Sequence, residues 1–362
     1  MSQIPVTILA GFLGSGKTTL LNRALRDPAL ARTAVVINEF GEISIDHSLV
    51  TTSDDNIMVL ENGCLCCTVF GDLIGTLNTL YHRRQAGDIP PFDRVVIETS
   101  GLADPVPVAQ AFMSEPTLAG LFRVATVIVT VDAVNGHATL DRHEESLRQA
   151  GLADHILITK LDLVPAEERS AAATTLCARL RHINPAATIS AIDDPAVDAV
   201  ALVGAPGLDP TESDAAAGQW LNLSAYEHHD HRHNHDDHGH GREHLRHDND
   251  IVSFAFVREQ PTSRYALQLL LNALEQNLGP NLLRVKGLVN VAEEPERPAV
   301  IQGAQHLLHN ISWLDRWPDA DRRTRIVFIT QNIDRASVEE MISLLDRVAT
   351  RTAKARERAG SI

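Results

Sequence analysis

Apolar residues in the first 200 positions gather into short runs, and each run ends at glycine or at polar residues. Runs of this length that are rich in valine and isoleucine are typical of strands buried on both faces of a sheet. Helical patterns separate these runs, so strands and helices alternate as a mostly parallel α/β sheet requires. The predicted strands lie within the stretches 6–25, 34–40, 92–105, 124–133 and 153–164.

The pattern changes in the second half of the chain. From residue 250 onward it predicts a strand, a helix at 264–278, three further strands and a last helix from about 335. This order fits a smaller α+β sandwich with helices on one face. The stretch 203–249 is rich in glycine, proline and aspartate and then in histidine, which predicts a linker. We therefore expect an α/β domain at 1–202, a linker at 203–249 and an α+β domain at 250–362.

Composition narrows the class of protein. The 362 residues are 44% hydrophobic, which can supply two cores, and the formal net charge is −15. Such an acidic chain is not expected to bind nucleic acid as its main partner, because nucleic acids demand clustered positive charge. No apolar run approaches membrane-spanning length and the N-terminus lacks the pattern of a signal peptide. We expect a cytoplasmic protein with reduced cysteines and no membrane partner.

The first predicted strand ends in a phosphate-binding loop. Gly11, Gly16, Lys17 and Thr18 satisfy the pattern G-x-x-x-x-G-K-[ST], followed at once by a predicted helix. The glycines let backbone N–H groups wrap the phosphates, and the helix directs its positive dipole end at them. In such a loop the lysine neutralises the β- and γ-phosphates and the threonine hydroxyl holds Mg²⁺.

Two later strand ends predict which nucleotide is bound. Glu98 precedes a Thr-Ser-Gly turn, where a carboxylate suits outer-shell Mg²⁺ binding beside a loop that senses the γ-phosphate. Asp162, in T-K-L-D, can accept hydrogen bonds from the N1–H and N2–H₂ groups of guanine, and adenine offers no such pair. We therefore predict a GTPase, with Lys17, Thr18 and Glu98 acting in hydrolysis. The residues predicted to hold GTP and Mg²⁺ are Gly11, Gly14, Ser15, Gly16, Lys17, Thr18, Thr19, Glu39, Glu98, Thr159, Lys160 and Asp162.

Three of the four cysteines lie within four positions, in "ENGCLCC". Cys66 and Cys67 are adjacent and could form only a strained disulfide, so the cluster indicates a soft-metal site or redox chemistry. Three thiolates with one further ligand would complete a tetrahedral zinc site, while Co²⁺ and Cu(I) are also compatible with these ligands. We expect Cys64, Cys66 and Cys67 as ligands, with Glu42 as the candidate for the fourth. The remaining Cys177 lies in a predicted helix and is expected to pack in the core.

The stretch 227–244 combines histidine with carboxylates and contains no apolar residue. It cannot contribute to a hydrophobic core, and histidine-rich tracts bind metal ions such as Zn²⁺, Ni²⁺, Co²⁺ and Cu²⁺. The alternative is a solvated linker without a role of its own. The candidate ligands are His228, His229, His231, His233, His235, His238, His240 and His244.

Together, "GFLGSGKTTLL", "INEFGE", "ENGCLCC", "ETSGLADP" and "TKLD" resemble the CobW-type GTPases, which are P-loop metallochaperones similar to UreG and HypB. The resemblance covers nearly the whole chain, because "LLRVKG" and "VIQGAQHLLH" resemble the C-terminal domain of that family. One departure is Thr159, where the usual motif has asparagine. The resemblance implies a P-loop NTPase domain with a mostly parallel sheet, followed by a smaller α+β domain.

The resemblance also implies slow GTP hydrolysis coupled to the delivery of zinc or cobalt, with the C-x-C-C cysteines as ligands. The expected partner is a metal-requiring client protein, and the expected oligomeric state is a monomer or a dimer that depends on nucleotide or metal. An alternative is a metal buffer or sensor whose affinity GTP sets without productive turnover. An ATP-dependent kinase is less consistent with T-K-x-D and with cysteines placed between two nucleotide-sensing stretches.

Overall fold

The computed structural model describes residues 3–38, 57–60, 66–207, 210, 213–227, 251–305, 307–308 and 311–359. The chain divides into two compact units, Met1–Gly207 and Leu208–Ile362. The division falls inside the stretch 203–249 that the sequence predicts to be a linker.

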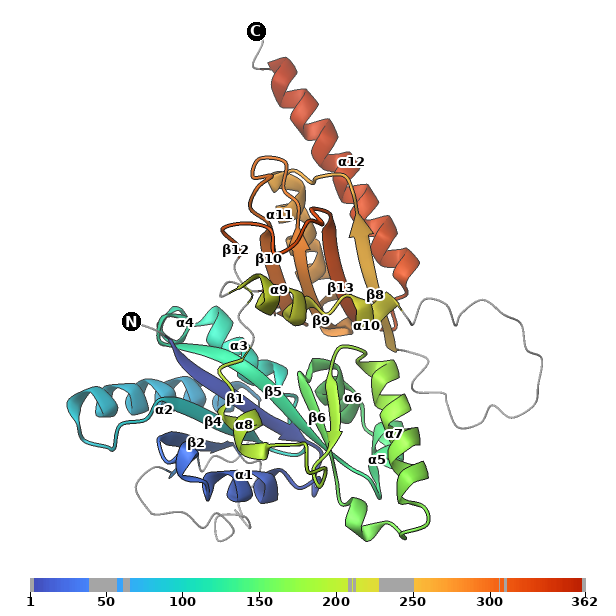
Figure 1. Cartoon of the computed structure of the whole chain (residues 1–362). Helices are drawn as coiled ribbons and strands as arrows, with labels where there is room; N and C mark the ends of the chain where they lie inside the picture. The colour runs from blue at the N-terminus through green and yellow to red at the C-terminus, as the bar shows by residue number, and fades with distance from the viewer. Residues whose placement is uncertain are drawn as a thin grey trace. The chain divides into compact units, whose positions relative to one another are not determined.

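The first unit is built on a parallel sheet, which confirms the α/β prediction (Figure 1). Within the described residues its strand order is β3-β2-β4-β1-β5-β6-β7. Strands β3 and β7, at the two edges, are not predicted from the sequence because each has only four residues. The strands are β1 (Ile4–Gly11), β2 (Thr33–Asn38), β3 (Ile57–Leu60), β4 (Arg94–Thr99), β5 (Phe122–Asp132), β6 (His155–Thr159) and β7 (Thr188–Ala191).

Helices follow the strands of this sheet, as right-handed crossovers require. Helix α1 starts directly after the predicted phosphate loop, and α2 starts at the cysteine pair. The helices are α1 (Lys17–Leu25), α2 (Cys66–Ala86), α3 (Val106–Ser114), α4 (Pro116–Leu121), α5 (Gly136–Arg142), α6 (Glu144–Leu152), α7 (Arg169–Ile183) and α8 (Ala199–Gly204), with 3-10 turns η1 (Pro28–Leu30) and η3 (Leu161–Leu163).

One hydrophobic core of this unit lies where α1 and α8 cover the sheet. Leu20 and Leu21 of α1 pack with Val203 of α8 against Leu9 of β1 and Val96 of β4. Ile128 of β5 and Leu157 of β6 belong to the same cluster. Because side chains alternate between the two faces of a strand, the residues two positions after these also point to the side of α1.

The second unit contains an antiparallel sheet, which confirms the α+β prediction. Its path is β11-β10-β9-β13-β8, and β12 pairs with β10. The strands are β8 (Ile251–Arg258), β9 (Leu282–Val289), β10 (Ala299–Ala304), β11 (Leu307–Leu308), β12 (Ser312–Trp313) and β13 (Thr324–Gln331). The helical segments are α9 (Asp214–Leu221), α10 (Ser224–Glu227), α11 (Arg264–Ala273), η6 (Leu274–Leu278), η7 (Gly279–Asn281) and α12 (Arg335–Ala359).

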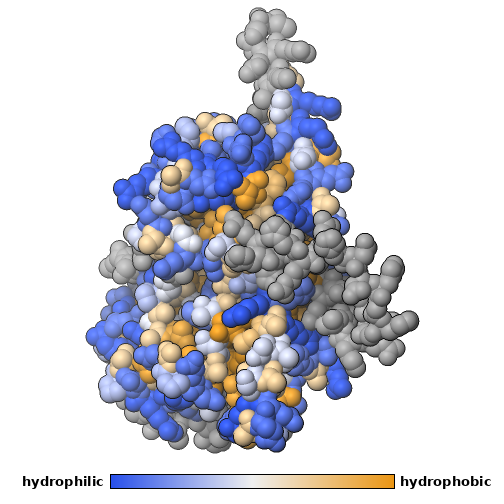
Figure 2. Space-filling view, turned by 45° about the vertical axis from the view of Figure 1, so that its right-hand side comes forward, coloured by the Kyte–Doolittle hydropathy of each residue, from blue (hydrophilic) through white to orange (hydrophobic). Residues whose placement is uncertain are grey.

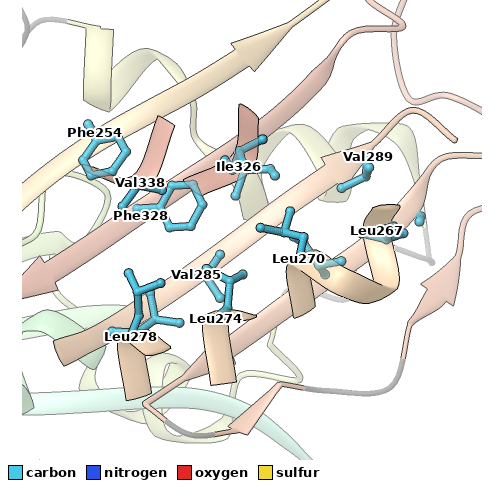
Figure 3. Close-up of a cluster of buried hydrophobic side chains, with 14 of the residues drawn as sticks. Phe254, Leu267, Leu270, Leu274, Leu278, Val285, Val289, Ile326, Phe328 and Val338 are labelled. Atoms are coloured by element: carbon cyan, nitrogen blue, oxygen red, sulfur yellow. The ribbon is translucent and has the colours of Figure 1, made fainter. Parts of the chain in front are cut away.

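The core of the second unit lies between this sheet and helices α11 and α12. Leu267 and Leu270 of α11 belong to one buried cluster with Val285 of β9, and Figure 3 shows Phe328 of β13 beside Phe254 of β8. The two phenylalanine rings are stacked with centroids 5.2 Å apart. Val338 and Ile342 of α12 complete the cluster.

The prediction that helices cover only one face of the second sheet is wrong. Val285 and Val289 face α11, so Lys286 between them points to the opposite face. There its ammonium lies 5.2 Å from the ring centroid of Trp220, which belongs to α9. Part of the expected linker is therefore folded: α9 packs on β9, α10 packs on β8, and Trp220 and Tyr226 are buried.

Polar and apolar residues are mixed on the face of the molecule that Figure 2 shows. On the face shown in Figure 2, hydrophilic residues dominate and apolar residues form small patches. Such patches are normal, because folded proteins expose a large share of apolar atoms. Among the described residues, no helix combines the length and the apolar character that crossing a bilayer requires.

Candidate nucleotide site

The phosphate loop connects β1 to α1, as the sequence predicts. Gly11, Gly14 and Gly16 have φ angles of 140°, 69° and 96°, which L-residues rarely adopt. A Cβ atom on Gly11 would lie 2.4 Å from the Thr130 hydroxyl oxygen and 2.7 Å from the Ser15 hydroxyl oxygen. Position 11 therefore requires glycine for two reasons, its backbone angle and the closeness of β5.

Buried polar contacts hold this loop in place. The Ser15 and Thr130 hydroxyl oxygens are 2.6 Å apart, in a bond between the loop and β5. The Lys17 ammonium donates to the carbonyl oxygens of Gly11 at 2.9 Å and Phe12 at 3.3 Å. The cationic group predicted to neutralise phosphate thus lies inside the curve of the loop.

The C-terminal ends of β4, β5 and β6 bring three polar side chains to this loop. Glu98, Thr130 and Thr159 each follow a core residue of the α1 face by two positions, so they point to the same side of the sheet as α1. All three are buried. The Thr18 hydroxyl donates to a Glu98 carboxylate oxygen at 2.6 Å, which brings together two residues that the sequence assigns to Mg²⁺.

The T-K-L-D motif lies next to the phosphate loop. The Thr159 hydroxyl donates to the Ser15 carbonyl oxygen at 2.7 Å, so threonine at this position still ties the motif to the loop. The Lys160 ammonium is 2.7 Å from the Asp132 carboxylate at the end of β5. Asp162 lies in the 3-10 turn η3 with an exposed side chain, where a base can reach it.

Asp132 is held in its ionised form. Burial alone would raise the pKa of this carboxyl, but hydrogen bonds from Lys160, Val134 and Asn135 outweigh it, and the pKa lies below its ordinary value. The ion pair with Asp132 thereby holds the Lys160 side chain in place beside the phosphate loop. Asp132 is not among the residues that the motifs predict, although a carboxylate at the end of a predicted strand is a signal that the sequence offers.

These residues fit GTP with Mg²⁺. The loop curves around Lys17, and the positive φ angles allow its backbone to approach an anion closely. The Thr18 hydroxyl and the Glu98 carboxylate are oxygen donors of the kind that Mg²⁺ prefers. When bound, Mg²⁺ neutralises charge on the β- and γ-phosphate oxygens. Thr18 would be the direct ligand, and Glu98 would accept a hydrogen bond in the outer shell.

The loop that follows Glu98 is held from the other side by α6. Gln149 of α6 donates its amide N–H groups to the carbonyl oxygens of Gly101 and Ala103, at 3.4 and 3.0 Å. Gln149 also lines a cavity of about 420 Å³ whose wall includes Phe12 and Leu13 of the phosphate loop. No pattern in the sequence marks Gln149, because its partner is 48 residues away.

The predicted metal ligands lie mostly outside the described residues. Glu39, Glu42, Cys64 and the histidines from His228 to His244 are among the residues left undescribed. Cys66 and Cys67 are the first two residues of α2. Within the described residues no group of three or more His, Cys, Asp or Glu side chains could hold a metal ion.

Cys177 is set apart from this chemistry. It lies on α7 and is half-buried. Burial raises the pKa of its thiol, with a smaller opposing effect of Arg181. A protonated thiol on a helix flank suits a packing role, as the sequence predicts, although the side chain is less enclosed than a core residue.

A loop of the phosphate-binding pattern, a threonine and glutamate pair beside it and a T-K-x-D motif, all at the C-terminal ends of strands of one parallel sheet, are typical of a P-loop GTPase. The sequence profile described as "CobW/HypB/UreG, nucleotide-binding domain" matches residues 5–191, and "Cobalamin synthesis protein cobW C-terminal domain" matches residues 251–345. The chain belongs to the CobW/HypB/UreG family, which confirms the resemblance seen in its motifs.

Relatives span nearly the whole chain. The zinc chaperone YjiA of Escherichia coli K12 is 32% identical over 329 residues, covering 91% of this chain and 94% of the relative. The zinc chaperone CobW of a Sinorhizobium species is 28% identical, covering 95% and 97%. The crystal structure of Zn(II)-bound YjiA GTPase from E. coli has a TM-score of 0.66 at 27% identity, covering 95% and 99%. A Zn(II)-bound YjiA triple mutant, with one glutamate and two cysteines changed to alanine, has a TM-score of 0.67 at 26% identity.

Proposed function

We propose that this GTPase is a metallochaperone that binds zinc through Cys64, Cys66 and Cys67 and transfers it to a client protein under the control of GTP. Glu42 is the proposed fourth ligand. GTP binding completes the metal site, and hydrolysis opens it. Cobalt remains an alternative cargo, since thiolate and carboxylate ligands accept both ions.

The register of three neighbouring strands is the observation that supports this proposal most. Strand β2 pairs in parallel with both β3 and β4, and Asn38 is opposite Leu60 on one side and Thr99 on the other. The chain that carries Cys64 therefore leaves β3 two strand spacings, about 10 Å, from the end of β4. Glu98, the partner of Thr18, is the residue before Thr99 on that strand.

The position of the cysteine pair on α2 adds a chemical argument. Cys66 and Cys67 occupy the first turn of a helix of 21 residues, where the helix dipole favours negative charge. Thiolate is the form that binds Zn²⁺ and the form that a helix N-terminus stabilises.

The relatives favour zinc among the compatible metals. Two that span most of this chain are named zinc chaperones, and both similar structures are Zn(II)-bound. One of these structures is Zn(II)-bound with a glutamate and two cysteines replaced by alanine. In this chain the histidine tract at 227–244 is the proposed second reservoir, which gathers metal before delivery.

Zinc release after a single turnover tests the proposal. Protein loaded with zinc, Mg²⁺ and GTP is mixed with a chromophoric zinc chelator, and zinc release is followed together with phosphate release. We expect the fast phase of zinc release to follow hydrolysis, and to be absent with a non-hydrolysable GTP analogue.

Glu98→Gln provides the control, because it keeps the size of the side chain while removing the charge beside Thr18. It should slow phosphate release and zinc release by the same factor. If zinc is released at the same rate with GTP, with the analogue and in the variant, the result instead favours a metal buffer, in which GTP hydrolysis does not drive zinc transfer.

A further inference from the structure

The loop at 100–104, which follows Glu98, lies between two fixed parts of the first unit. On one side it touches the phosphate loop: a Cβ atom on Gly101 would be 2.5 Å from the backbone nitrogen of Leu13. On the other side the Gln149 amide donates to the carbonyl oxygens of Gly101 and Ala103. The backbone of this loop is therefore in contact with the phosphate loop and bonded to α6.

Gln149 is well suited to hold a backbone loop. Its side chain is enclosed, with 1% of the residue exposed, so the carbonyl oxygens that it serves cannot exchange freely with water. The helix that carries it packs against β1, which leads into the phosphate loop, and against β5, to which that loop is bonded. The backbone that carries Gln149 is therefore anchored on the central sheet.

Neighbouring residues of α6 reinforce the same arrangement. Arg148 lies 3.8 Å from the Asp104 carboxylate, and Asp104 accepts a hydrogen bond from the Val106 backbone N–H at the start of α3. The ring of His143, the residue before α6, lies against the ring of Phe12 of the phosphate loop, tilted by 32° with centroids 4.4 Å apart. One helix thus contacts both the phosphate loop and the loop after Glu98.

We propose that Gln149 is a positioning residue for GTP hydrolysis. It acts through the loop 100–104: by holding two carbonyl groups, it keeps the backbone next to Leu13 where a γ-phosphate would meet it. Without the Gln149 amide, GTP still binds to the phosphate loop, but the loop 100–104 is no longer held in a fixed position beside the phosphate loop. This inference concerns the hydrolytic step alone and does not depend on metal delivery.

The test compares Gln149→Leu with Ser146→Ala, measuring kcat and KM for GTP and the affinities for GDP and a non-hydrolysable GTP analogue. Ser146 is the matched control: it lies on the same helix and lines the same cavity, but its hydroxyl donates to the carbonyl oxygens of Thr139 and His143. We expect Gln149→Leu to lower kcat roughly 10- to 100-fold, the scale of an ångström of misplacement. Its GDP affinity should change less than about twofold, while the preference for the analogue over GDP falls.

Gln149→Glu guards against a variant that does not fold, because it keeps the shape of the side chain. Its carboxylate would face the two carbonyl oxygens, so kcat should fall at least as far as in Gln149→Leu, and recover in part as the pH is lowered and the carboxyl regains a proton. Melting temperatures identify which variants are folded. The proposal is overturned by an unchanged kcat in a folded Gln149 variant. It is also overturned if only KM and the GDP dissociation constant rise, or if Ser146→Ala loses as much kcat as Gln149→Leu.

Discussion

At the scale of single residues, the nucleotide site depends on polar side chains placed by the alternation of strands. Glu98, Thr130 and Thr159 come from three different strands, yet all reach the phosphate loop because each points to the face that α1 covers. The motif pattern predicts Glu98 and Thr159 from the sequence. It does not predict Thr130, which has no motif of its own and becomes visible only when β5 is placed beside β1.

Thr159→Val tests the contact that this threonine makes in place of asparagine. Valine keeps the shape but loses the 2.7 Å bond to the Ser15 carbonyl oxygen, which stays buried without that donor. Such a loss costs about 1–2 kcal/mol, or roughly 5- to 30-fold in affinity. We expect GDP and GTP to bind more weakly by that factor in a calorimetric titration.

Thr159→Ser is the matched control, since serine keeps the hydroxyl and removes only the methyl group. It should bind nucleotide almost as well as the unaltered protein. If valine and serine at this position bind equally well, the hydroxyl does not order the phosphate loop.

At the scale of elements, the sequence predicts long apolar strands and strongly patterned helices well and predicts short elements poorly. Helix α9 has a buried face of only Ala217, Trp220 and Leu221, and the glycine- and proline-rich residues before it favoured a linker. What stabilises this helix is its packing on β9, a contact far along the chain. Helix α2 is also not predicted from the sequence. Its first turn contains Cys66 and Cys67, and the cysteine motif indicates metal chemistry without indicating a helix.

Trp220→Ala tests whether α9 belongs to the core of the second unit. The indole is buried, and the Lys286 ammonium lies over its ring. Removing a buried aromatic side chain costs about 3–5 kcal/mol. We expect the free energy of unfolding of the second unit to fall by about that amount in urea titrations.

Gln219→Ala, an exposed change on the same helix, should alter the free energy of unfolding by less than about 0.5 kcal/mol. Equal unfolding curves for the two variants would mean that α9 is a surface appendage and that the linker prediction describes it better.

At the scale of the whole molecule, the proposed metal ligands belong to chain segments that begin or end at strands of the GTPase unit. The ends of β2, β3 and β4 are in register, so the cysteine motif and the loop after Glu98 start from neighbouring positions. If these segments change position when the γ-phosphate is present, all of the metal ligands come together in only one of the two nucleotide states. Zinc binding and nucleotide binding are then linked. The factor by which the nucleotide raises the affinity for zinc must equal the factor by which zinc raises the affinity for the nucleotide.

Two variants separate the proposed ligands from the histidine tract. Replacing Cys66 and Cys67 with serine should remove the effect of nucleotide on zinc affinity while GTP still binds. Deleting residues 227–244 should lower the total capacity for weakly bound zinc and leave the tightest site and its nucleotide dependence intact, since long surface loops contribute little to stability.

The most direct test is the affinity for zinc in two nucleotide states, measured by competition with a chromophoric chelator. Zinc binding alone is not sufficient, because the tract at 227–244 offers other ligands. With Mg²⁺ and a non-hydrolysable GTP analogue, we expect the tightest zinc site to bind roughly 5- to 150-fold more tightly than with GDP, which is the range of a coupling free energy of about 1–3 kcal/mol. Equal zinc affinities in the two states, in protein that binds both nucleotides, would contradict the account.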